Sequence, residues 1–588
     1  MSETTERHGG DLVAEVLERA GIRHVFTLCG GHISPILVGA KRLGMKVVDV
    51  RDEAAAVFAA DAVARMTGIP GVAAVTAGPG VTNALTAIKN AQLAQSPVIV
   101  FGGATATLLK GRGALQDIDQ ISLVRSAVKW FASIKTLPAL APAVEKAVRI
   151  SQSGVPGPVF LEVPVDLLYP ESIVRKWYIE ESGVKKSKSL GSRALGLYLE
   201  GHLYRQFRMP RVPVPDVDLP ELAVPFGDDA ERALAETAEL LRRAERPALV
   251  VGNQTMAGVR DPAPLARAIG DLGIPVWLGG SARGLLGRHH PTQFRHARGN
   301  ALKEADVVVV AGFPFDFRLK YGLGIGSKAK LVSANLSRRE LRKNRRPDVT
   351  AHVHAAEFLQ RLSRRVGSPG AGRWDAWLDV VRKREAARDA EIAAQAKPDG
   401  ELVDPLHLFL RLEEKMADDA ILVVDGGDFV ATAAYTLRPR APLSWLDPGV
   451  FGTLGVGGGF AVGAGTLHPK RELWLLYGDG SSAYSLAEID TCVRHGLAPI
   501  AVIGTDASWA QIARDQVDLL GDDVGTTLVR TDYHVVGDGY GGKGLLLKDP
   551  SKVDETLDEA IAIARSGKPV VINVHIARTD FRKGSISI

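Results

Sequence analysis

The sequence predicts an α/β protein of three doubly wound domains with mainly parallel sheets. Short runs rich in Val, Ile and Leu alternate along the chain with longer Ala-rich segments of helical periodicity, the pattern of parallel strands joined by crossover helices. These runs fall into three separated groups, and 588 residues suit three or four domains of ordinary size. We therefore expect three successive α/β domains.

The expected strands are short apolar runs bounded by turn residues. Those of the first group are His24–Leu28, Val47–Val50, Val72–Thr76, Pro97–Gly102 and Pro158–Val163. Those of the second group are Ala248–Val251, Pro275–Leu278, Asp306–Val310 and Lys330–Ala334. Those of the third group are Ile421–Val424, Leu473–Tyr477, Pro499–Ile503 and Pro569–Ile576.

Two connecting stretches separate the groups. Residues 186–228 are rich in proline and contain an amphipathic segment at Leu195–Phe207, for which we favour a linker helix over a helix lying on a membrane surface. Residues 368–400 hold a Pro-Gly junction followed by a charged helical segment. The expected domains are therefore 1–185, 229–367 and 401–588.

Composition excludes several classes of protein. The net charge of +5 is spread over the chain without a long basic block, so we expect no nucleic-acid partner. Two cysteines, Cys29 and Cys492, exclude a disulfide scaffold. No apolar run reaches the length of a membrane span, and the N-terminus lacks the apolar core of a signal peptide. We expect a cytoplasmic protein without membrane partners.

The most informative motif is Gly478-Asp479-Gly480, which ends one expected strand, while Thr505-Asp506 ends the next. The two aspartates are 27 positions apart, about the length of a strand–helix–strand crossover, so both should lie at one sheet edge. Carboxylate oxygens suit Mg²⁺, and the backbone N–H groups that open the next helix at Gly480 and Ser481 suit a diphosphate.

This spacing resembles the GDG…NN signature of thiamine diphosphate (ThDP) enzymes. The resemblance implies that Asp479, Asp506 and the carbonyl of Ser508 ligate Mg²⁺. Thr505-Asp506 replaces the family's two asparagines and adds a negative charge beside the diphosphate. The alternative role of Asp506 is to cap a turn or the following helix.

The N-terminal half carries matching motifs. Residues 50–58 resemble the R-H-E-x-A segment, which implies that Glu53 hydrogen-bonds the aminopyrimidine of ThDP; alternatively, Glu53 only supports a helix dipole. Thr76, Gly78 and Asn83 match the T-S-G-P-G-x-x-N turn that packs on the pyrimidine. The family builds its active sites across subunits, which implies a homodimer or homotetramer.

Further positions follow from the same resemblance. His32, in the loop after the first strand, and Gln116 are catalytic candidates near the substrate. The Gly452 carbonyl would accept from the cofactor's amino group, and Leu454 would separate its two rings. Asp428, after another strand, matches a diphosphate contact.

The substrate class depends on the central domain. Ala297-Arg-Gly-Asn-Ala-Leu302 resembles a stretch of the CoA-using branch, and the whole chain resembles the acetolactate-synthase-like group with 2-hydroxyacyl-CoA lyase activity. This implies cleavage of the C1–C2 bond of a 2-hydroxyacyl-CoA, through a ThDP ylid, to formyl-CoA and an aldehyde or ketone; 2-hydroxyisobutyryl-CoA is one candidate substrate.

Arg298 and Arg318 are candidate partners for the CoA phosphates or for a bound ADP. The central domain is also left open to FAD or to neither nucleotide. Two other functions stay open, an acetolactate synthase or related 2-oxoacid decarboxylase, and a non-catalytic protein of the same fold.

Overall fold

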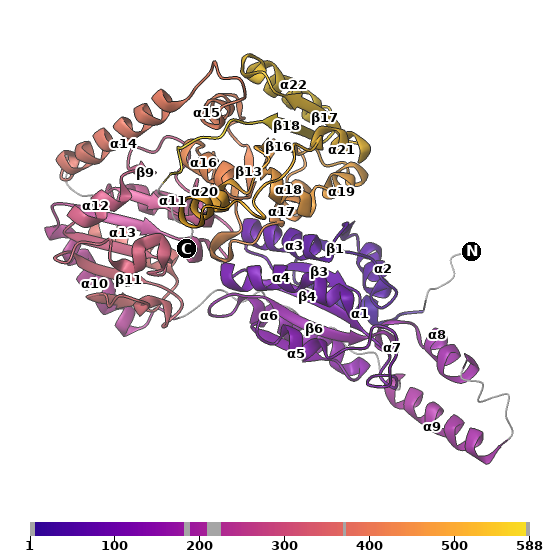
Figure 1. Cartoon of the computed structure of the whole chain (residues 1–588). Coiled ribbons are helices and arrows are strands. Elements are labelled where there is room, and N and C mark those ends of the chain that lie inside the picture. The colour runs from indigo at the N-terminus through magenta and orange to yellow at the C-terminus, as the bar shows by residue number, and fades with distance from the viewer. Residues whose placement is uncertain (1–5, 182–188, 208–224, 368–371, 584–588) are drawn as a thin grey trace. The chain divides into compact units, whose positions relative to one another are not determined.

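The computed structural model describes residues 6–181, 189–207, 225–367 and 372–583 (Figure 1). The chain divides into two compact units. Unit 1 comprises Met1–Ala64 with Ile69–Glu221, and unit 2 comprises Arg65–Gly68 with Leu222–Ile588. The proline-rich part of the expected linker at 208–224 and the junction at 368–371 lie outside the described residues.

Unit 1 contains a six-stranded sheet of order β2-β1-β3-β4-β6-β5 whose named strands pair in parallel. The strands are β1 (His24–Thr27), β2 (Lys46–Asp49), β3 (Gly71–Val75), β4 (Val98–Ala104), β5 (Trp130–Ser133) and β6 (Val159–Pro164). Every residue of β3, β4 and β6 is buried, which explains their continuous apolar sequences. The sequence did not predict β5, a half-buried edge strand.

Helices cover both faces of the unit 1 sheet (Figure 1). α1, α2 and α6 share one apolar core with the strands, and α4 packs on β3 and β4. The helices are α1 (Gly9–Arg19), α2 (Ser34–Arg42), α3 (Glu53–Thr67), α4 (Pro79–Ala94), α5 (Gln120–Val124), α6 (Leu140–Gln152), α7 (Val165–Leu168), α8 (Glu171–Arg175) and α9 (Leu190–Phe207). α9 contains the amphipathic segment expected in the linker and buries Leu199 and Leu203.

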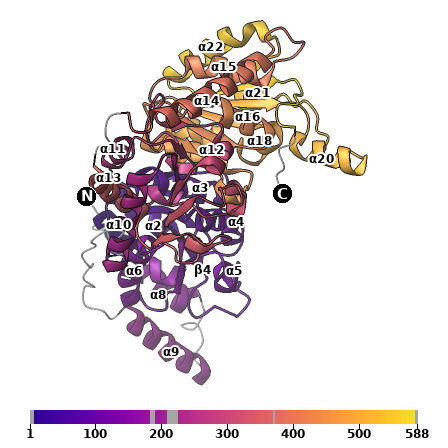
Figure 2. The ribbon, with the colours of Figure 1, turned by 90° about the vertical axis from the view of Figure 1, so that its left-hand side faces the viewer.

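The first sheet of unit 2 has the order β12-β11-β10-β7-β8-β9. Its strands are β7 (Pro247–Val251), β8 (Val276–Leu278), β9 (Gln293–Phe294), β10 (Val307–Ala311), β11 (Lys330–Ala334) and β12 (Val349–Ala351). Its helices are α10 (Asp228–Arg243), α11 (Ala263–Asp271), α12 (Arg298–Glu304) and α13 (Ala355–Val366). The charged helix α14 (Asp375–Gln395) follows and contacts both β9 and α15. Figures 1 and 2 show α14 beside α15.

The second sheet of unit 2 has the order β14-β13-β15-β16-β18-β17. Its strands are β13 (Ile421–Asp425), β14 (Trp445–Leu446), β15 (Leu473–Gly478), β16 (Ile500–Thr505), β17 (Lys543–Leu547) and β18 (Val570–His575). Its helices are α15 (Pro405–Lys415), α16 (Asp428–Thr436), α17 (Val456–Leu467), α18 (Asp479–Ser485), α19 (Glu488–His495), α20 (Ala510–Leu520), α21 (Tyr533–Gly539) and α22 (Val553–Arg565).

The predicted fold class, three α/β domains with parallel sheets, is confirmed. In each sheet the first strand lies between two later strands, with β1 between β2 and β3, β7 between β8 and β10, and β13 between β14 and β15, so each sheet has a switch point where neighbouring loops diverge and ligands bind in such folds. Among the described residues, no helix has the length and apolarity needed to cross a membrane.

Candidate active site

In unit 1, Glu53 begins α3 and its side chain is buried. Asn83, from the first turns of α4, donates a hydrogen bond of 3.1 Å from Nδ2 to Glu53 Oε2. A Cβ atom added to Gly80 would lie 3.3 Å from Glu53 Oε1 and 3.0 Å from Thr76 Cγ2. The glycine therefore lets α4 approach closely, and the structure brings Glu53, Thr76 and Asn83 together.

His32 lies beside the same cluster. Its Nδ1 is 3.3 Å from Thr76 Oγ1, and a Cβ atom on Gly103 would lie 2.5 Å from its own Cβ. Burial lowers the pKa of His32 below its ordinary value, so the imidazole is neutral near pH 7 and able to accept a proton. His32 therefore lies beside Thr76, and Glu53 lies beside Gly80, which itself packs on Thr76.

Gln116 packs on the glycine turn of this cluster. It adopts a left-handed backbone conformation with φ 63°, and its Cβ would lie 3.0 Å from a Cβ added to Gly78. A non-glycine residue in this conformation is strained, and such strain is common at functional sites. The structure thus places Gln116 next to Gly78.

A buried network below this turn was not predicted. Gln120 accepts a hydrogen bond of 2.9 Å from the Gly78 backbone N–H and donates one of 3.1 Å to Glu162. Glu162 is 1% exposed and also pairs with Lys110 and Ser133. Gln120 stood inside the same glutamine-containing segment as Gln116, but its partner Glu162 is 42 positions away, so local sequence gave no signal.

In unit 2, the Asp479 and Asp506 corners lie side by side. β15 and β16 are parallel neighbours with Gly478 paired to Gly504, so the expected adjacency of the two strands is confirmed. Asp479 Oδ2 accepts a hydrogen bond of 2.8 Å from the Ala507 N–H, and Asp506 Oδ1 accepts one of 3.1 Å from the Ser508 N–H.

The electrostatics of this corner suit a cation. Burial, and then the charge of Asp479, raise the pKa of Asp506 to about 6, and burial raises the pKa of Asp479. Two desolvated carboxylates that oppose each other's ionisation are stabilised by a divalent ion between them. The described residues contain no group of three His, Cys, Asp or Glu side chains suited to a metal, so an ion here would also need carbonyl or ligand oxygens.

Asp425, which begins the segment that ends at Asp428, connects two further parts of the expected site, a role that the sequence did not predict. Its fully buried carboxylate accepts hydrogen bonds from the N–H groups of Gly455 (3.0 Å) and Gly457 (2.8 Å). Its carbonyl accepts one of 2.6 Å from Ser481 Oγ. Burial raises the pKa of Asp425 to about 7. One residue therefore connects the Gly452–Gly455 turn to the helix opened by Gly480.

The turn itself is shaped for close approach by a ligand. Gly452 has φ 65°, and a Cβ added there would meet nothing within 4 Å. Leu454 lies half-buried two residues later. Asp428 begins α16, where its carboxylate forms an ion pair with Arg514 of α20.

A basic cavity of about 680 Å³ lies in unit 2 between the central sheet, α14 and α16. Arg298 and Arg318 both line this cavity, and the Arg298 guanidinium donates a hydrogen bond of 2.6 Å to the Arg318 backbone carbonyl. The described lining contains one acidic side chain, Glu391, against the cations Arg283, Arg295, Arg298, Arg318, Lys320, Arg384, Arg388 and Arg438. This excess of positive charge suits a polyanion.

A second cavity of about 380 Å³ adjoins the basic one. The two share the lining residues Leu278, Arg283, Arg298, Arg318 and Ala434. The second cavity is lined by apolar side chains such as Phe313, Val430 and Trp445 and by the polar side chains of Asn253, Asp447 and Gln511, and it reaches Gly426 and Gly427 at the end of β13. The three arginines Arg283, Arg298 and Arg318 therefore lie where the two cavities meet.

Comparisons with known proteins agree with this arrangement. Three models described as "Thiamine pyrophosphate enzyme" match, namely the N-terminal TPP binding domain at residues 7–123, the central domain at 234–362 and the C-terminal TPP binding domain at 425–574.

Relatives match along the whole chain. "2-hydroxyacyl-CoA lyase 2" of Danio rerio is 46% identical over 99% of this chain and 94% of its own length, and its Homo sapiens counterpart is 45% identical over 100% and 93%. An "acetolactate synthase large subunit" of Mycobacterium tuberculosis is 34% identical over 96% and 95%. The chain belongs to the thiamine pyrophosphate enzyme family, in the acetolactate-synthase-like group that includes the 2-hydroxyacyl-CoA lyases.

Proposed function

We propose that this protein is a 2-hydroxyacyl-CoA lyase. The observation that carries the proposal is the basic cavity, which adjoins a second cavity that has apolar side chains in its lining and reaches Gly426 and Gly427. Coenzyme A has this order of parts, because an adenosine diphosphate with a third phosphate is followed by a long uncharged arm. The near full-length likeness to 2-hydroxyacyl-CoA lyase 2 supports the same substrate class.

The reaction breaks the C1–C2 bond of the acyl group. C1 keeps the electron pair and gains a proton to become formyl-CoA, while the C2 hydroxyl loses its proton and becomes the carbonyl of an aldehyde or ketone. Atoms and electrons balance without a further reactant. When bound, thiamine diphosphate supplies the electron sink that this bond cleavage needs.

The residues of unit 1 fit the pyrimidine half of the cofactor. Glu53 presents a buried carboxylate held by Asn83, which is the group required to exchange a proton with an aminopyrimidine. Gly78 and Gly80 have no side chains, which lets Gln116 pack closely on Gly78 and lets Thr76 and Glu53 pack closely on Gly80. Thr76 lies beside these residues and contacts His32.

We assign the substrate's proton transfers to His32 and its orientation to Gln116. His32 is neutral near pH 7 because burial lowers its pKa. Its Nδ1 faces Thr76, so Nε2 is the nitrogen we assign to the C2 hydroxyl. Gln116 is fixed by its packing on Gly78 and offers both a donor and an acceptor to the thioester carbonyl.

The residues of unit 2 fit the diphosphate half. We propose that Asp479, Asp506 and the Ser508 carbonyl hold Mg²⁺, and that Gly480 and Ser481 meet phosphate oxygens at the start of α18. Gly452 and Leu454 would border the rings, with the turn fixed by Asp425. Asp428 would reach the diphosphate only after leaving Arg514.

The nucleotide end is assigned to the basic cavity. Arg298, Arg318 and Arg283 lie at the junction of the two cavities, where they would pair with the diphosphate of CoA or of a bound ADP. Our proposal also includes a homodimer or homotetramer and a cytoplasmic location.

The competing function is acetolactate synthesis, which the 34% identical relative named acetolactate synthase large subunit represents. Products formed from a panel of 2-hydroxyacyl-CoAs and from pyruvate, identified by mass spectrometry, separate the two. Formyl-CoA from the panel supports the proposal, and acetolactate from pyruvate as the dominant product contradicts it.

A further inference from the structure

Helix α14 forms one wall of the basic cavity, although the sequence showed it only as a charged connecting helix. Arg384, Ala387, Arg388 and Glu391 line the cavity at the three- and four-residue spacing of one helical face. Trp377, Leu378 and Val381 anchor the preceding turns in an apolar core of the central sheet. The helix is therefore held rigidly beside the cavity.

The adjoining face of α14 grips the loop after β9. Glu385 accepts hydrogen bonds from the backbone N–H groups of Arg295 (3.0 Å) and His296 (2.8 Å). One turn later, Asp389 Oδ1 accepts a hydrogen bond of 2.6 Å from the Arg295 guanidinium and lies 3.3 Å from His296 Nε2. The second carboxylate oxygen of Asp389, Oδ2, accepts a hydrogen bond of 3.0 Å from the Arg438 guanidinium.

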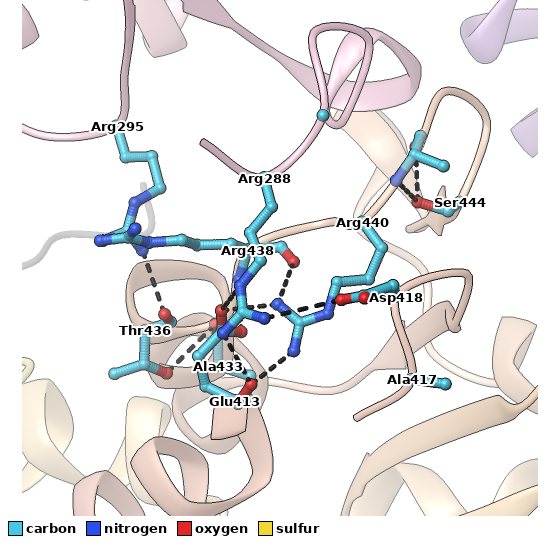
Figure 3. Close-up of polar contacts among 12 residues, drawn as sticks. Arg288, Arg295, Glu413, Ala417, Asp418, Ala433, Thr436, Arg438, Arg440 and Ser444 are labelled. Atoms are coloured by element: carbon cyan, nitrogen blue, oxygen red, sulfur yellow. Dashed lines mark hydrogen bonds and ion pairs between the residues drawn. The ribbon is translucent and has the colours of Figure 1, made fainter. Parts of the chain in front are cut away.

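Arg295 lies in the loop after β9 and Arg438 in the loop after α16, and both line the basic cavity. Figure 3 shows both arginines beside Thr436, whose carbonyl accepts a hydrogen bond of 3.1 Å from the Arg295 guanidinium. The same cluster contains Glu413, which pairs with Arg440 and accepts 3.0 Å from the Arg438 backbone N–H. The Arg295 guanidinium also donates a hydrogen bond of 2.9 Å to the Tyr435 carbonyl, and Asp389 is the group that contacts both guanidinium groups.

We propose that Asp389 is a positioning residue for anion recognition, which bridges Arg295 and Arg438 so that both present donors to the phosphates of the nucleotide in the basic cavity. This inference rests on the proposed function, because it assumes that a CoA-type nucleotide binds there. Asp389 does not itself line the cavity and acts through the two arginines. Without it, two neighbouring cations would repel each other and separate.

The sign of one measurement separates this role from a simple charge effect. Replacing Asp389 by Asn removes a negative charge close to the cavity, which by charge alone strengthens anion binding. Loss of the bridge weakens it instead, because the arginines leave their positions. We expect Asp389→Asn to bind ADP and free CoA about tenfold more weakly by calorimetry, on the scale of one lost charge-assisted contact.

The matched control is Asp379→Asn on the same helix, whose carboxylate pairs with Arg382 at the exposed surface. It should leave both affinities unchanged. In turnover, Asp389→Asn should raise the KM for the acyl-CoA and leave kcat and the ThDP affinity unchanged. If Asp389→Asn fails to fold, Asp389→Glu replaces it, and we expect a smaller loss of affinity.

Unchanged or tighter ADP binding in Asp389→Asn or Asp389→Glu overturns the positioning role. The proposed function still stands in that case, provided that the wild-type protein binds ADP and CoA. Absence of ADP and CoA binding in the wild-type protein overturns instead the assignment of the cavity, and the inference with it.

Discussion

The Asn83 side chain donates a hydrogen bond of 3.1 Å to the carboxylate of Glu53. Asn83 lies on α4 and Glu53 begins α3, so two crossover helices meet at one buried acid. Glu53 needs this partner because a buried carboxylate oxygen without a hydrogen bond is costly. The hydrogen bond from Asn83 therefore fixes the orientation of the Glu53 carboxylate.

Glu53→Gln should abolish most turnover and leave the fold intact. An amide keeps the size of the side chain but exchanges no proton, so we expect a loss in kcat of about 10²–10⁴-fold. Steady-state formation of formyl-CoA measures it. The control Glu145→Gln changes an acid of α6 that pairs with Arg149 and should retain activity. Near-normal turnover in Glu53→Gln would favour a non-catalytic role for this acid.

Asp425 makes the stability of the protein without cofactor depend on pH. Burial raises its pKa from an ordinary 3.8 to about 7, so the folded state binds the proton more tightly than the unfolded state. The free energy of unfolding therefore falls as pH rises from about 4 to about 7, by up to about 4 kcal/mol. Asp425→Asn lacks this titration.

Thermal midpoints measured between pH 5 and 8 test this prediction. Relative to Asp425→Asn, the wild-type midpoint should decline toward pH 8. Parallel curves for the two proteins would show that Asp425 stays ionised across this range.

Asp506 should determine the requirement for Mg²⁺. Asp506→Ala removes an oxygen ligand and should raise the Mg²⁺ concentration for half-maximal activity about tenfold or more, whereas Asp506→Asn retains an oxygen and should raise it less. Titration of the metal-free protein with Mg²⁺ at fixed ThDP measures both. Equal Mg²⁺ requirements in all three proteins would mean that Asp506 only shapes the turn.

Gly480 tests the packing at the start of α18. A Cβ added there would lie 2.5 Å from ring atoms of Trp509, and the backbone is not in the left-handed region, so the effect is purely steric. Gly480→Ala should cost about 1–3 kcal/mol in the free energy of unfolding. Trp509→Leu in the same background should recover much of that loss. Denaturant unfolding that shows no loss would mean that the indole moves aside freely.

The sequence was sufficient for the core strands and for the adjacency of the Asp479 and Asp506 corners. β15 and β16 are buried, apolar and joined by a crossover of ordinary length, so their ends could be placed side by side from spacing alone. β9 and β14 are two residues long, and β5 and β17 are edge strands with exposed or half-buried residues. β5, β9 and β14 lack the long apolar run on which the prediction depended, whereas the short run Leu545–Leu547 of β17 was not recognised as a strand.

The supporting residues of the site were beyond sequence reasoning for a physical reason. Asp425 reaches Gly455 and Gly457 about thirty positions away, and α14 contributes a cavity wall only because a loop of the central sheet lies against it. Hydrogen bonds between distant segments leave no local periodicity. Motifs identify groups that would touch the cofactor, whereas the residues that hold those groups appear only in the fold.

Isotope labelling tests the central claim most directly. A 2-hydroxyacyl-CoA carrying ¹³C at C1 is incubated with the protein, ThDP and Mg²⁺, and the products are separated by mass. Cleavage of the C1–C2 bond predicts that the label appears in formyl-CoA and that the aldehyde or ketone is unlabelled. Intact labelled substrate, together with acetolactate formed from pyruvate, would contradict the account.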